Sequence, residues 1–362
     1  MTKGFCGRCF WGERRLSLVA SVTLFTFFAS CPALSEDHNK VRIAGSAWIG
    51  DAPTWVADRE GLFNYNRPSG APAIEVRLHN SGMEALMQLL DGEAEFALAA
   101  TTPTALALIG ALDENGPGSS SLVVLGSVAL SNQSHYVIAP AALDIESPQD
   151  LGGKRVGIMF GTSSHYGWSR FSAFHGLDAA GVELIDMPVS EMSSALQQGE
   201  IEAGVIWQPW DLELRESLDD RITILPMRML YTVNWLLLTR EPFVAEHPEL
   251  VERVLRGYIT AIDMIDANHE RALALHAAAT GRDDEDLSAM AANMLWRLGM
   301  NWSVLVNLGT QFEWLATWPE YNHLPIPEPG HYLHGDSLRQ VAPDRVTLPD
   351  YLQTSGYRDT RR

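Results

Sequence analysis

The sequence predicts an α/β protein built from two similar lobes, and three observations lead to this fold class. Short apolar runs alternate with helix-like runs from residue 41 to residue 227, a pattern typical of parallel sheets covered by helices. The stretch GEAEFALAATTP at 92–103 is echoed by GEIEAGVIWQPW at 199–210. The 327 residues from 36 to 362 also suit two domains of ~150 residues each.

The amino-terminal segment has the three parts of a secretory signal peptide. Four basic residues precede an uncharged, mostly apolar run at 16–30, and Ala33-Leu34-Ser35 provides small residues before a cut at Glu36. The apolar run is shorter than the ~20 residues that a membrane-spanning helix needs. We therefore expect residues 1–35 to be removed and the protein to be exported to the periplasm. A lipid anchor on Cys31, which follows Ala29-Ser30, remains an alternative.

All three cysteines of the chain lie in this segment. Cys6 and Cys9 form a CxxC, which can indicate redox or metal chemistry, but no second pair exists in the sequence. We interpret the CxxC as chance, and we expect a processed protein without cysteine or disulfide. A twin-arginine export signal at Arg14-Arg15 is a weaker alternative to ordinary secretion.

The balance of charges excludes one class of partner. The chain carries 45 acidic and 26 basic side chains, for a formal net charge of −19. Nucleic-acid binding requires basic surfaces that neutralise phosphates, so we expect no nucleic-acid partner. We expect a monomer that binds a small molecule.

The first block of the sequence predicts a repeated strand–helix pattern. Ser81 and Glu84 form a capping-box pattern at the start of one helix, and Pro103 lies in the first turn of the next. The expected strands are 41–48, 73–79, 95–100 and 122–130, and the expected helices are 54–63, 81–92 and one that begins at Thr101.

The second block repeats this pattern, and the remainder is mostly helical. The expected strands of the second block are 135–140, 154–160, 182–188, 202–207 and 222–227, with helices at 161–175 and 190–199. The β-rich run 228–240 is long enough to pass between the two lobes. Beyond it we expect helices at 250–265, 272–279 and 286–298, and a surface loop at 320–350.

The echoed stretches lie at the ends of two strand–helix–strand units, 73–100 and 182–207. Ligands of open parallel sheets bind beyond the carboxyl ends of the strands. Thr101 and Thr102 follow the last strand of one unit, while Trp207 and Trp210 stand at the end of the other. These residues are therefore expected to face one another across a cleft, unless the two units resemble each other by chance.

The stretch GTSSHYG at 161–167 predicts an anion-binding helix start. Unpaired backbone N–H groups and a partial positive charge mark the beginning of a helix, and Thr162, Ser163 and Ser164 add hydroxyl donors. A sulfonate, carboxylate or nitrate suits such a site, although an ordinary helix cap has the same sequence. We expect His165 to donate a hydrogen bond or to be structural, because no nucleophile motif accompanies it.

Other candidate residues lie at predicted strand ends and helix starts. Indole rings there offer a ligand wall or a cage for a cation, although each is also compatible with a core role. Asp51 is a candidate partner for an ammonium group, and Ser81 and Gly82 begin a helix in the first block. The four candidate tryptophans are Trp48, Trp207, Trp210 and Trp235.

The sequence contains no motif that predicts a catalytic residue, a cofactor or a metal site. His331 and His334 form an H-x-x-H in a proline-rich segment without an accompanying acid, which is a weak metal signal. We expect no enzyme activity.

Several stretches together resemble the nitrate/sulfonate/taurine-type periplasmic substrate-binding proteins of ABC transporters. The resemblance covers 41–350 and is carried by LGGKRVGIMFGTSSHYGWSRF, ALMQLLDGEAEFALAATTP, HPELVERVLRGY and ALQQGEIEAGVIWQPW. It implies a type II periplasmic binding protein fold, with lobe I at 41–130 plus 228–362, lobe II at 131–227, and crossing strands as a hinge. The ligand would be enclosed between the lobes and presented to a membrane permease.

By position, the resemblance also implies that the candidate residues named above, except Asp51 and Trp235, line the cleft. Gln208 stands where an acid is common in the family, which mildly favours an anionic ligand. Two alternatives remain open. One is an enzyme of thiamine-pyrimidine or cofactor biosynthesis on the same fold, and the other is a periplasmic ligand sensor.

Overall fold

The computed structural model describes residues 40–115, 121–177, 181–219, 221–227, 230–282 and 284–353. The predicted signal peptide, with the CxxC and Cys31, lies outside the described residues. Residues 39–362 form one compact unit, to which all the following statements refer. Within its described part, no helix is long and apolar enough to cross a membrane.

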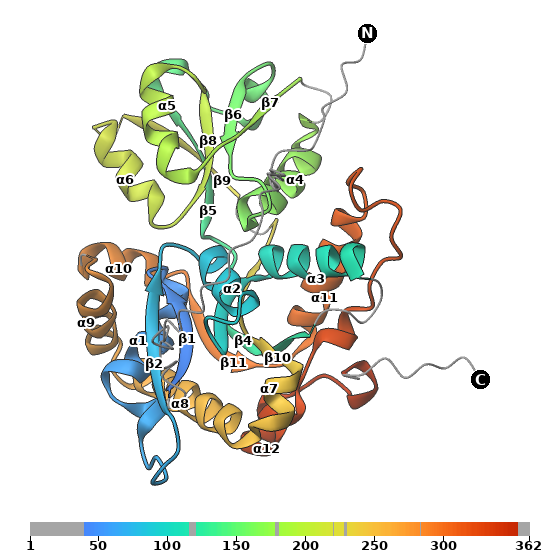
Figure 1. The fold of residues 1–362 in the computed structure, drawn as a ribbon. Helices are drawn as coiled ribbons and strands as arrows, with labels where there is room; N and C mark the ends of the chain where they lie inside the picture. Colours follow the sequence, from blue (N-terminus) through green and yellow to red (C-terminus); the bar gives the residue numbers. More distant parts are fainter. Residues whose placement is uncertain are drawn as a thin grey trace, which may run out of the picture. The chain divides into compact units, whose positions relative to one another are not determined.

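Two separate sheets organise this unit (Figure 1). The first has six strands in the order β11-β4-β10-β3-β1-β2, and the second has five in the order β7-β6-β8-β5-β9. The strands are β1 (Lys40–Ser46), β2 (Ala73–His79), β3 (Phe96–Ala100), β4 (Leu122–Ser131), β5 (His135–Pro140), β6 (Arg155–Ile158), β7 (Glu183–Asp186), β8 (Ala203–Trp207), β9 (Ile222–Pro226), β10 (Val233–Arg240) and β11 (Leu295–Gly299).

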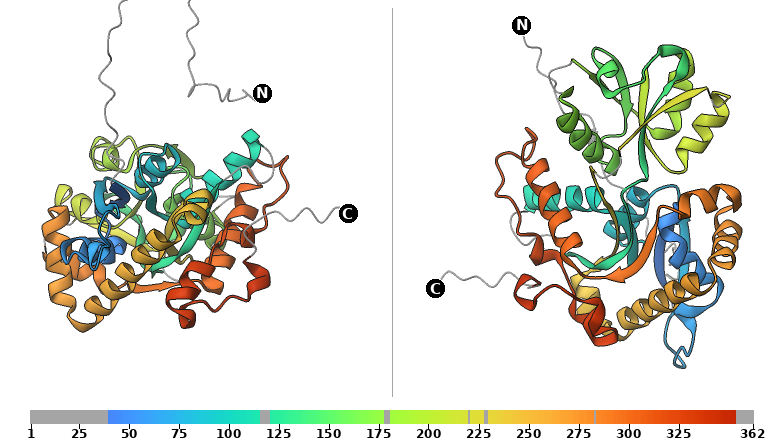
Figure 2. Two further views of the ribbon diagram at one scale, coloured as in Figure 1. Left: turned by 60° about the horizontal axis from the view of Figure 1, so that its bottom comes forward. Right: turned by 180° about the vertical axis from the view of Figure 1, so that it is seen from behind.

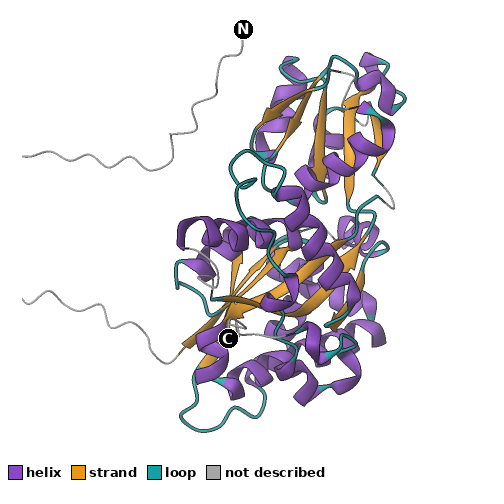
Figure 3. Cartoon of the chain, turned by 90° about the vertical axis from the view of Figure 1, so that its right-hand side faces the viewer, coloured by secondary structure: helices purple, strands orange, loops and turns teal. Residues whose placement is uncertain are grey.

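Helices pack along both sheets (Figure 3). Their bounds are α1 (Ala52–Arg59), α2 (Gly82–Leu90), α3 (Thr101–Asn115), α4 (Ser163–His175), α5 (Met192–Gln198), α6 (Trp210–Ser217), α7 (Glu241–Glu246), α8 (Pro248–Ala267), α9 (His269–Thr280), α10 (Asp284–Ala291), α11 (Trp302–Leu315) and α12 (Asp336–Val341). Although far apart in sequence, α3 and α11 lie side by side (Figure 1 and Figure 2).

The first sheet is mixed, and its centre is apolar. β1 pairs in parallel with β2 and β3, whereas β10 runs antiparallel between β3 and β4. All five residues of β3 are buried, which explains its continuous apolar sequence. The long helix α8 buries its apolar stripe, including Val251 and Tyr258, against the same core.

The second sheet has the same mixed character. β6 pairs in parallel with β7 and β8, while β5 runs antiparallel between β8 and β9. The chain passes between the sheets twice: through residues 132–134 from β4 to β5, and between β9 and β10, where residues 227 and 230–232 are described. Within the predicted β-rich run 228–240, the residues from Val233 to Arg240 form β10, a central strand of the first sheet.

Two expectations for the carboxyl-terminal part were wrong, and one helix was missed. The predicted helix 286–298 ends at Ala291, and β11 follows, because the buried Trp296 and Leu298 alternate with exposed residues and the segment pairs with β4. Helix α11 was not predicted. The predicted surface loop 320–350 contains α12, and Leu333 within it is fully buried in the first core.

Candidate functional site

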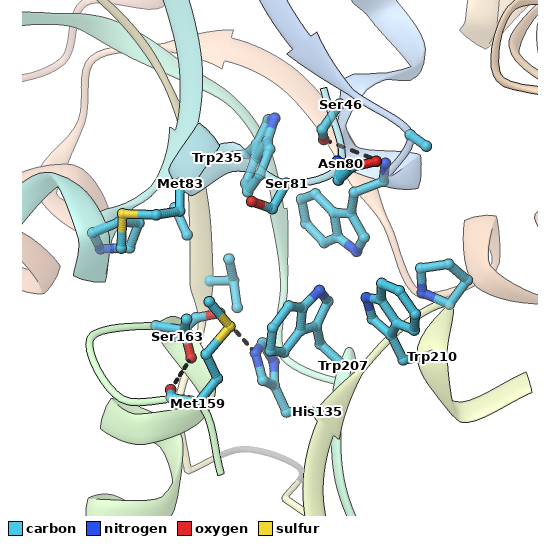
Figure 4. A pocket seen from close by; sticks show the side chains of 18 of the residues that line it. Ser46, Asn80, Ser81, Met83, His135, Met159, Ser163, Trp207, Trp210 and Trp235 are labelled. Atoms are coloured by element: carbon cyan, nitrogen blue, oxygen red, sulfur yellow. Dashed lines mark hydrogen bonds between the residues drawn. The ribbon is translucent and has the colours of Figure 1, made fainter. Parts of the chain in front are cut away.

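A pocket opens where the edges of both sheets present their loops (Figure 4). Its wall is largely apolar and aromatic with a few polar groups, as is usual for small-molecule sites. The lining residues are Ser46, Ala47, Trp48, Asn80, Ser81, Gly82, Met83, Ala100, Pro103, His135, Met159, Thr162, Ser163, Trp207, Pro209, Trp210, Val233, Trp235 and Arg282.

The topology of the sheets explains why these residues meet. Ser46, Ala100 and Trp207 are the last residues of β1, β3 and β8, and Asn80 directly follows β2. Because β5 and β10 run antiparallel to their neighbours, their first residues lie at the same edges. The pocket thus lies at the carboxyl ends of the parallel strands, where the sequence placed it.

Eight of the candidate residues line this pocket. Four come from the two helix starts that the sequence singled out, two come from the second half of the echo at 199–210, and none comes from the first half at 92–103. These residues are Trp48, Ser81, Gly82, Thr162, Ser163, Trp207, Trp210 and Trp235.

The other five candidates lie away from the pocket wall. Asp51, Thr101, Thr102 and Ser164 are almost completely buried and pack behind it. Thr101 donates a hydrogen bond to the carbonyl of Asn234, 3.4 Å away, which fixes it to β10. Successive helix residues point about 100° apart, so Ser163 can face the pocket while Ser164 does not.

His165 lies in an aromatic cluster instead of the pocket. Its ring stacks on Phe160, with 4.2 Å between centroids, and contacts Trp314 and Trp318 of the α11 region at 5.0 and 5.1 Å. Burial lowers the pKa of His165 to about 4, despite the nearby carboxylate of Asp186. The structural role that the sequence left open is thus the one that this geometry supports.

Sequence reasoning missed the lining residues that lack a recognisable local pattern. His135 begins a strand, Arg282 follows a helix, and Met83 and Met159 look like ordinary apolar residues. Asn80 and Ser46 offered a signal that was overlooked. Both are polar residues at predicted strand ends, like the candidates that were chosen.

Indole rings form much of the pocket wall. The rings of Trp48 and Trp235 lie 4.6 Å apart at 54°. Trp207 at the end of β8 and Trp210 at the start of α6 also line the pocket (Figure 4). Two glycines permit this packing. A Cβ atom on Gly82 would lie 2.4 Å from the ring of Trp235, and one on Gly50 would lie 1.9 Å from that of Trp48.

A buried carboxyl group holds this wall from behind. Oδ1 of Asp51 accepts a hydrogen bond from Nε1 of Trp235 at 2.7 Å, and Oδ2 accepts one from the hydroxyl of Ser46 at 2.7 Å. Burial raises the pKa of Asp51 to about 7, and the bonds from Ser46, Trp235 and Thr54 only partly oppose this rise. Asp51 therefore positions lining residues and does not reach the pocket itself.

The start of α2 contributes polar groups to the first side of the pocket. Ser81 caps the helix, its hydroxyl accepting from the backbone N–H of Glu84 at 3.2 Å, as the sequence pattern predicts. The carboxylate of Glu84 accepts from the backbone N–H of Asn80, one residue earlier than an ideal capping box requires. This geometry leaves the first turn of α2 at the pocket edge.

The start of α4 lies on the other side. Thr162 is its N-cap residue and donates through its hydroxyl to the carbonyl of Met159 at 2.7 Å. Ser163, the first helical residue, lies 2.9 Å from Nε2 of His135. Two helix N-termini, each with partial positive charge, therefore border one pocket.

A charged side chain at the pocket adds to the partial positive charge of the two helix N-termini. Arg282 is the one Lys, Arg, Asp or Glu among the described lining residues. Its guanidinium lies 3.7 Å from the carboxylate of Glu213 in α6, and both side chains are partly exposed. His135 is neutral, because burial lowers its pKa to about 3. The described wall therefore offers positive charge without an opposing carboxylate of its own.

The described residues contain no group of three or more His, Cys, Asp or Glu that is arranged to hold a metal ion. The polar atoms at the pocket are hydroxyl, amide, imidazole, indole and guanidinium groups. These groups suit hydrogen bonding to an anionic or polar organic molecule.

Comparisons with known proteins place this geometry in context. Residues 73–272 match the family described as NMT1/THI5 like. A binding protein of Brucella abortus strain 2308 is 26% identical over 284 residues, which cover 78% of this chain and 83% of that protein. The taurine-binding periplasmic protein of Escherichia coli K12 is 24% identical over 246 residues, covering 67% of this chain and 72% of that protein.

Solved structures with this fold include the alkanesulfonate-binding protein of Xanthomonas axonopodis pv. citri bound to MOPS. It superposes with a TM-score of 0.65 at 16% identity, covering 82% of this chain and 98% of that one. The predicted fold class is therefore confirmed. The chain belongs to the NMT1/THI5-like family and has the fold of the periplasmic binding proteins.

Proposed function

We propose that this protein is an extracytoplasmic solute-binding protein that delivers a small organic anion or zwitterion to an ABC permease. The observation that carries the proposal is the pocket, where the starts of α2 and α4 and the guanidinium of Arg282 border a wall of four indoles. The names of the Brucella and Escherichia coli relatives support the same function.

The composition of the wall favours an organic solute over nitrate. An acidic group finds hydroxyl donors at Ser81 and Ser163, and Arg282 supplies charge. The indole N–H of Trp48 is buried without a hydrogen-bond partner among the described residues and is a further donor. Nitrate would leave the indole faces uncovered, whereas the carbon skeleton of a sulfonate or taurine-like molecule packs against them.

We further propose that the solute is enclosed by hinge closure. Lobe I would comprise 41–130 and 228–362, and lobe II would comprise 131–227, as the family resemblance implies. The connecting residues 132–134 and 230–232, which precede β5 and β10, would then absorb the change in backbone angles. Capture on both sides of the pocket favours the closed form, because the solute gains contacts there that the open form lacks.

A thermal-shift and calorimetric screen tests this proposal. The full chain is expressed with its own amino-terminal segment, purified from the periplasm of a Gram-negative host, and mixed with benzenesulfonate, ethanesulfonate, taurine, nitrate or acetate. A ligand at 100 times its Kd stabilises the folded state by about 2.7 kcal/mol. We expect sulfonates to raise Tm and nitrate to have little effect, and a lack of response to every organic anion contradicts the proposal.

Two further measurements separate the alternatives. Mass spectrometry of the purified protein distinguishes cleavage before Glu36 from lipidation of Cys31 or retention of the leader. Chromatography of the solute after prolonged incubation should recover it unchanged. Chemical conversion of the solute would support the enzyme alternative instead.

A further inference from the structure

His135 links two serine hydroxyls at the pocket. It is the first residue of β5, directly after the connecting segment 132–134. Its Nδ1 lies 3.0 Å from Oγ of Ser134, and its Nε2 lies 2.9 Å from Oγ of Ser163. Ser163 lines the pocket beside His135 (Figure 4), whereas Ser134 does not line it, so the imidazole connects a buried hydroxyl to an accessible one.

A neutral imidazole gives this chain of hydrogen bonds a direction. His135 is 7% exposed, and burial holds its pKa at about 3, so it carries one N–H near neutral pH. If Nδ1 is protonated, Nε2 accepts from the hydroxyl of Ser163. If Nε2 is protonated, it donates to Ser163, and Nδ1 accepts from the hydroxyl of Ser134.

The surroundings of Ser134 select between these two directions. Its side-chain oxygen is buried, and among the described residues its one hydrogen-bond partner is Nδ1 of His135. A proton on Nδ1 would force Ser134 to accept, which would leave a buried O–H without an acceptor at a cost of ~1–3 kcal/mol. A proton on Nε2 avoids this cost, since Ser134 then donates to Nδ1.

The consequence appears at Ser163. Its oxygen accepts from Nε2 of His135, and no other hydrogen-bond partner of its side chain is found among the described residues. Its own O–H is therefore available to a molecule in the pocket. With the proton on Nδ1, Ser163 would donate to Nε2 of His135 and would offer a solute only the lone pairs of its oxygen.

We propose that His135 is a positioning residue that fixes Ser163 as a hydrogen-bond donor, so that the pocket selects groups that only accept hydrogen bonds. As regards the solute, this inference rests on the proposed function. It predicts discrimination between a sulfonate and the sulfonamide of the same size, because the N–H groups of a sulfonamide would meet a donor. The direction of the hydrogen bonds from Ser134 through His135 to Ser163 does not depend on a bound solute.

The position of the proton on the His135 ring, which sets the direction of these hydrogen bonds, can be measured in the protein without a ligand. In ¹⁵N-histidine-labelled full-length protein, Nδ1 of His135 should resonate as an unprotonated nitrogen and Nε2 as a protonated one, at pH 6 and pH 8 alike. His135→Gln assigns the signal by its disappearance. A protonated Nδ1 overturns the proposal, whatever the protein binds.

A ligand pair tests the consequence. The ratio of Kd values for benzenesulfonamide and benzenesulfonate is measured in the wild type, Ser134→Ala, His135→Gln and, as a control, His165→Leu. Ser134→Ala removes the group that selects the tautomer, so the ratio should fall ~3- to 10-fold. His135→Gln offers an amide donor in place of Nε2–H and should keep the ratio, as should His165→Leu, whose side chain lies outside the pocket.

The two experiments separate failure of this inference from failure of the proposed function. An unchanged ratio in Ser134→Ala overturns the inference while sulfonate binding, and with it the proposed function, still stands. If neither probe binds although Nε2 of His135 is protonated, the proposed organic-anion function fails. The direction of the hydrogen bonds from Ser134 to Ser163 is then still established.

Discussion

The indole Nε1 of Trp235 donates a 2.7 Å hydrogen bond to Oδ1 of Asp51, which lies 184 residues earlier in the chain. The bond joins the pocket-facing start of β10 to the turn after β1. The other carboxylate oxygen accepts from the hydroxyl of Ser46, a second lining residue. One buried acid thus supports two parts of the pocket wall, and its protonation links the pocket to folding stability.

Asp51 should make the protein less stable as the pH rises. Its pKa is about 7 in the folded protein, against an ordinary value of 3.8. Between about pH 4 and pH 7 the unfolded chain has lost this proton while the folded chain keeps it, so the free energy of unfolding falls by up to about 4 kcal/mol and is constant above that window. Urea unfolding followed by tryptophan fluorescence at several pH values measures this change.

Asp51→Asn isolates this contribution from the other titrating groups. The variant keeps the shape of the side chain but cannot ionise, so its stability curve should lack the fall that Asp51 causes. The free energy of unfolding of the wild type minus that of the variant should fall steadily from pH 4 to pH 7. A constant difference across this range would show that Asp51 is ionised in the folded protein.

Gly82 should be intolerant of a methyl group because of its contact with Trp235. A Cβ atom there would lie 2.4 Å from the ring and 3.1 Å from the Cα atom of Ala99. Gly82→Ala should therefore displace the indole, lower stability by ~1–3 kcal/mol and weaken benzenesulfonate binding about tenfold. Thermal unfolding and isothermal titration calorimetry report the two effects.

Gly110 is the matched control for this substitution. It lies within α3, and nothing would be within 4 Å of an added Cβ atom. Gly110→Ala should raise stability by ~0.5–1 kcal/mol and leave binding unchanged. Equal behaviour of the two alanine variants would contradict the role of Gly82 in shaping the wall.

Local pattern predicted most of the fold. The strands 73–79 and 135–140 were predicted with their observed bounds, because apolar alternation and flanking breakers are local properties. The strand at 295–299 was missed, since its sequence LWRLG becomes a strand only by pairing with β4, more than 160 residues away. Strand pairing with such a distant segment cannot be recognised from the residues next to it in the sequence.

The sequence predicted the location of the candidate site more accurately than the residues that line it. Helix starts and strand ends indicated where Ser163 and Trp207 would lie, because topology brings such positions to one edge. Which side of a helix turn faces the pocket depends on packing, so Ser164 and His165 could not be separated from Ser163. His135 depends on a bond to a residue 28 positions away, which no spacing in the sequence announces.

Arg282 and Glu213 should affect anion binding in opposite directions. The carboxylate of Glu213 lies 3.7 Å from the guanidinium and competes with a bound anion for it. Arg282→Gln should weaken benzenesulfonate binding about tenfold, whereas Glu213→Gln should strengthen it by up to about fivefold, since exposed ion pairs contribute ~0.2–1 kcal/mol. Titration calorimetry at low and high salt measures both, and weakening by both substitutions would mean that the ion pair itself shapes the pocket.

Ser163 and Ser164 should respond differently to alanine, although they are neighbours in the same helix turn. Ser163 lines the pocket, and loss of a hydroxyl that donates to an anion costs ~1.5–3 kcal/mol, so Ser163→Ala should raise the Kd for benzenesulfonate about 10- to 100-fold. The hydroxyl of Ser164 is buried without a hydrogen-bond partner among the described residues. Ser164→Ala should therefore leave binding unchanged and preserve or raise Tm, because removing an unpaired buried polar group is not destabilising. Calorimetry and thermal unfolding of the two variants test the assignment. A larger loss of affinity in Ser164→Ala than in Ser163→Ala would show that the start of α4 presents a different face to the solute.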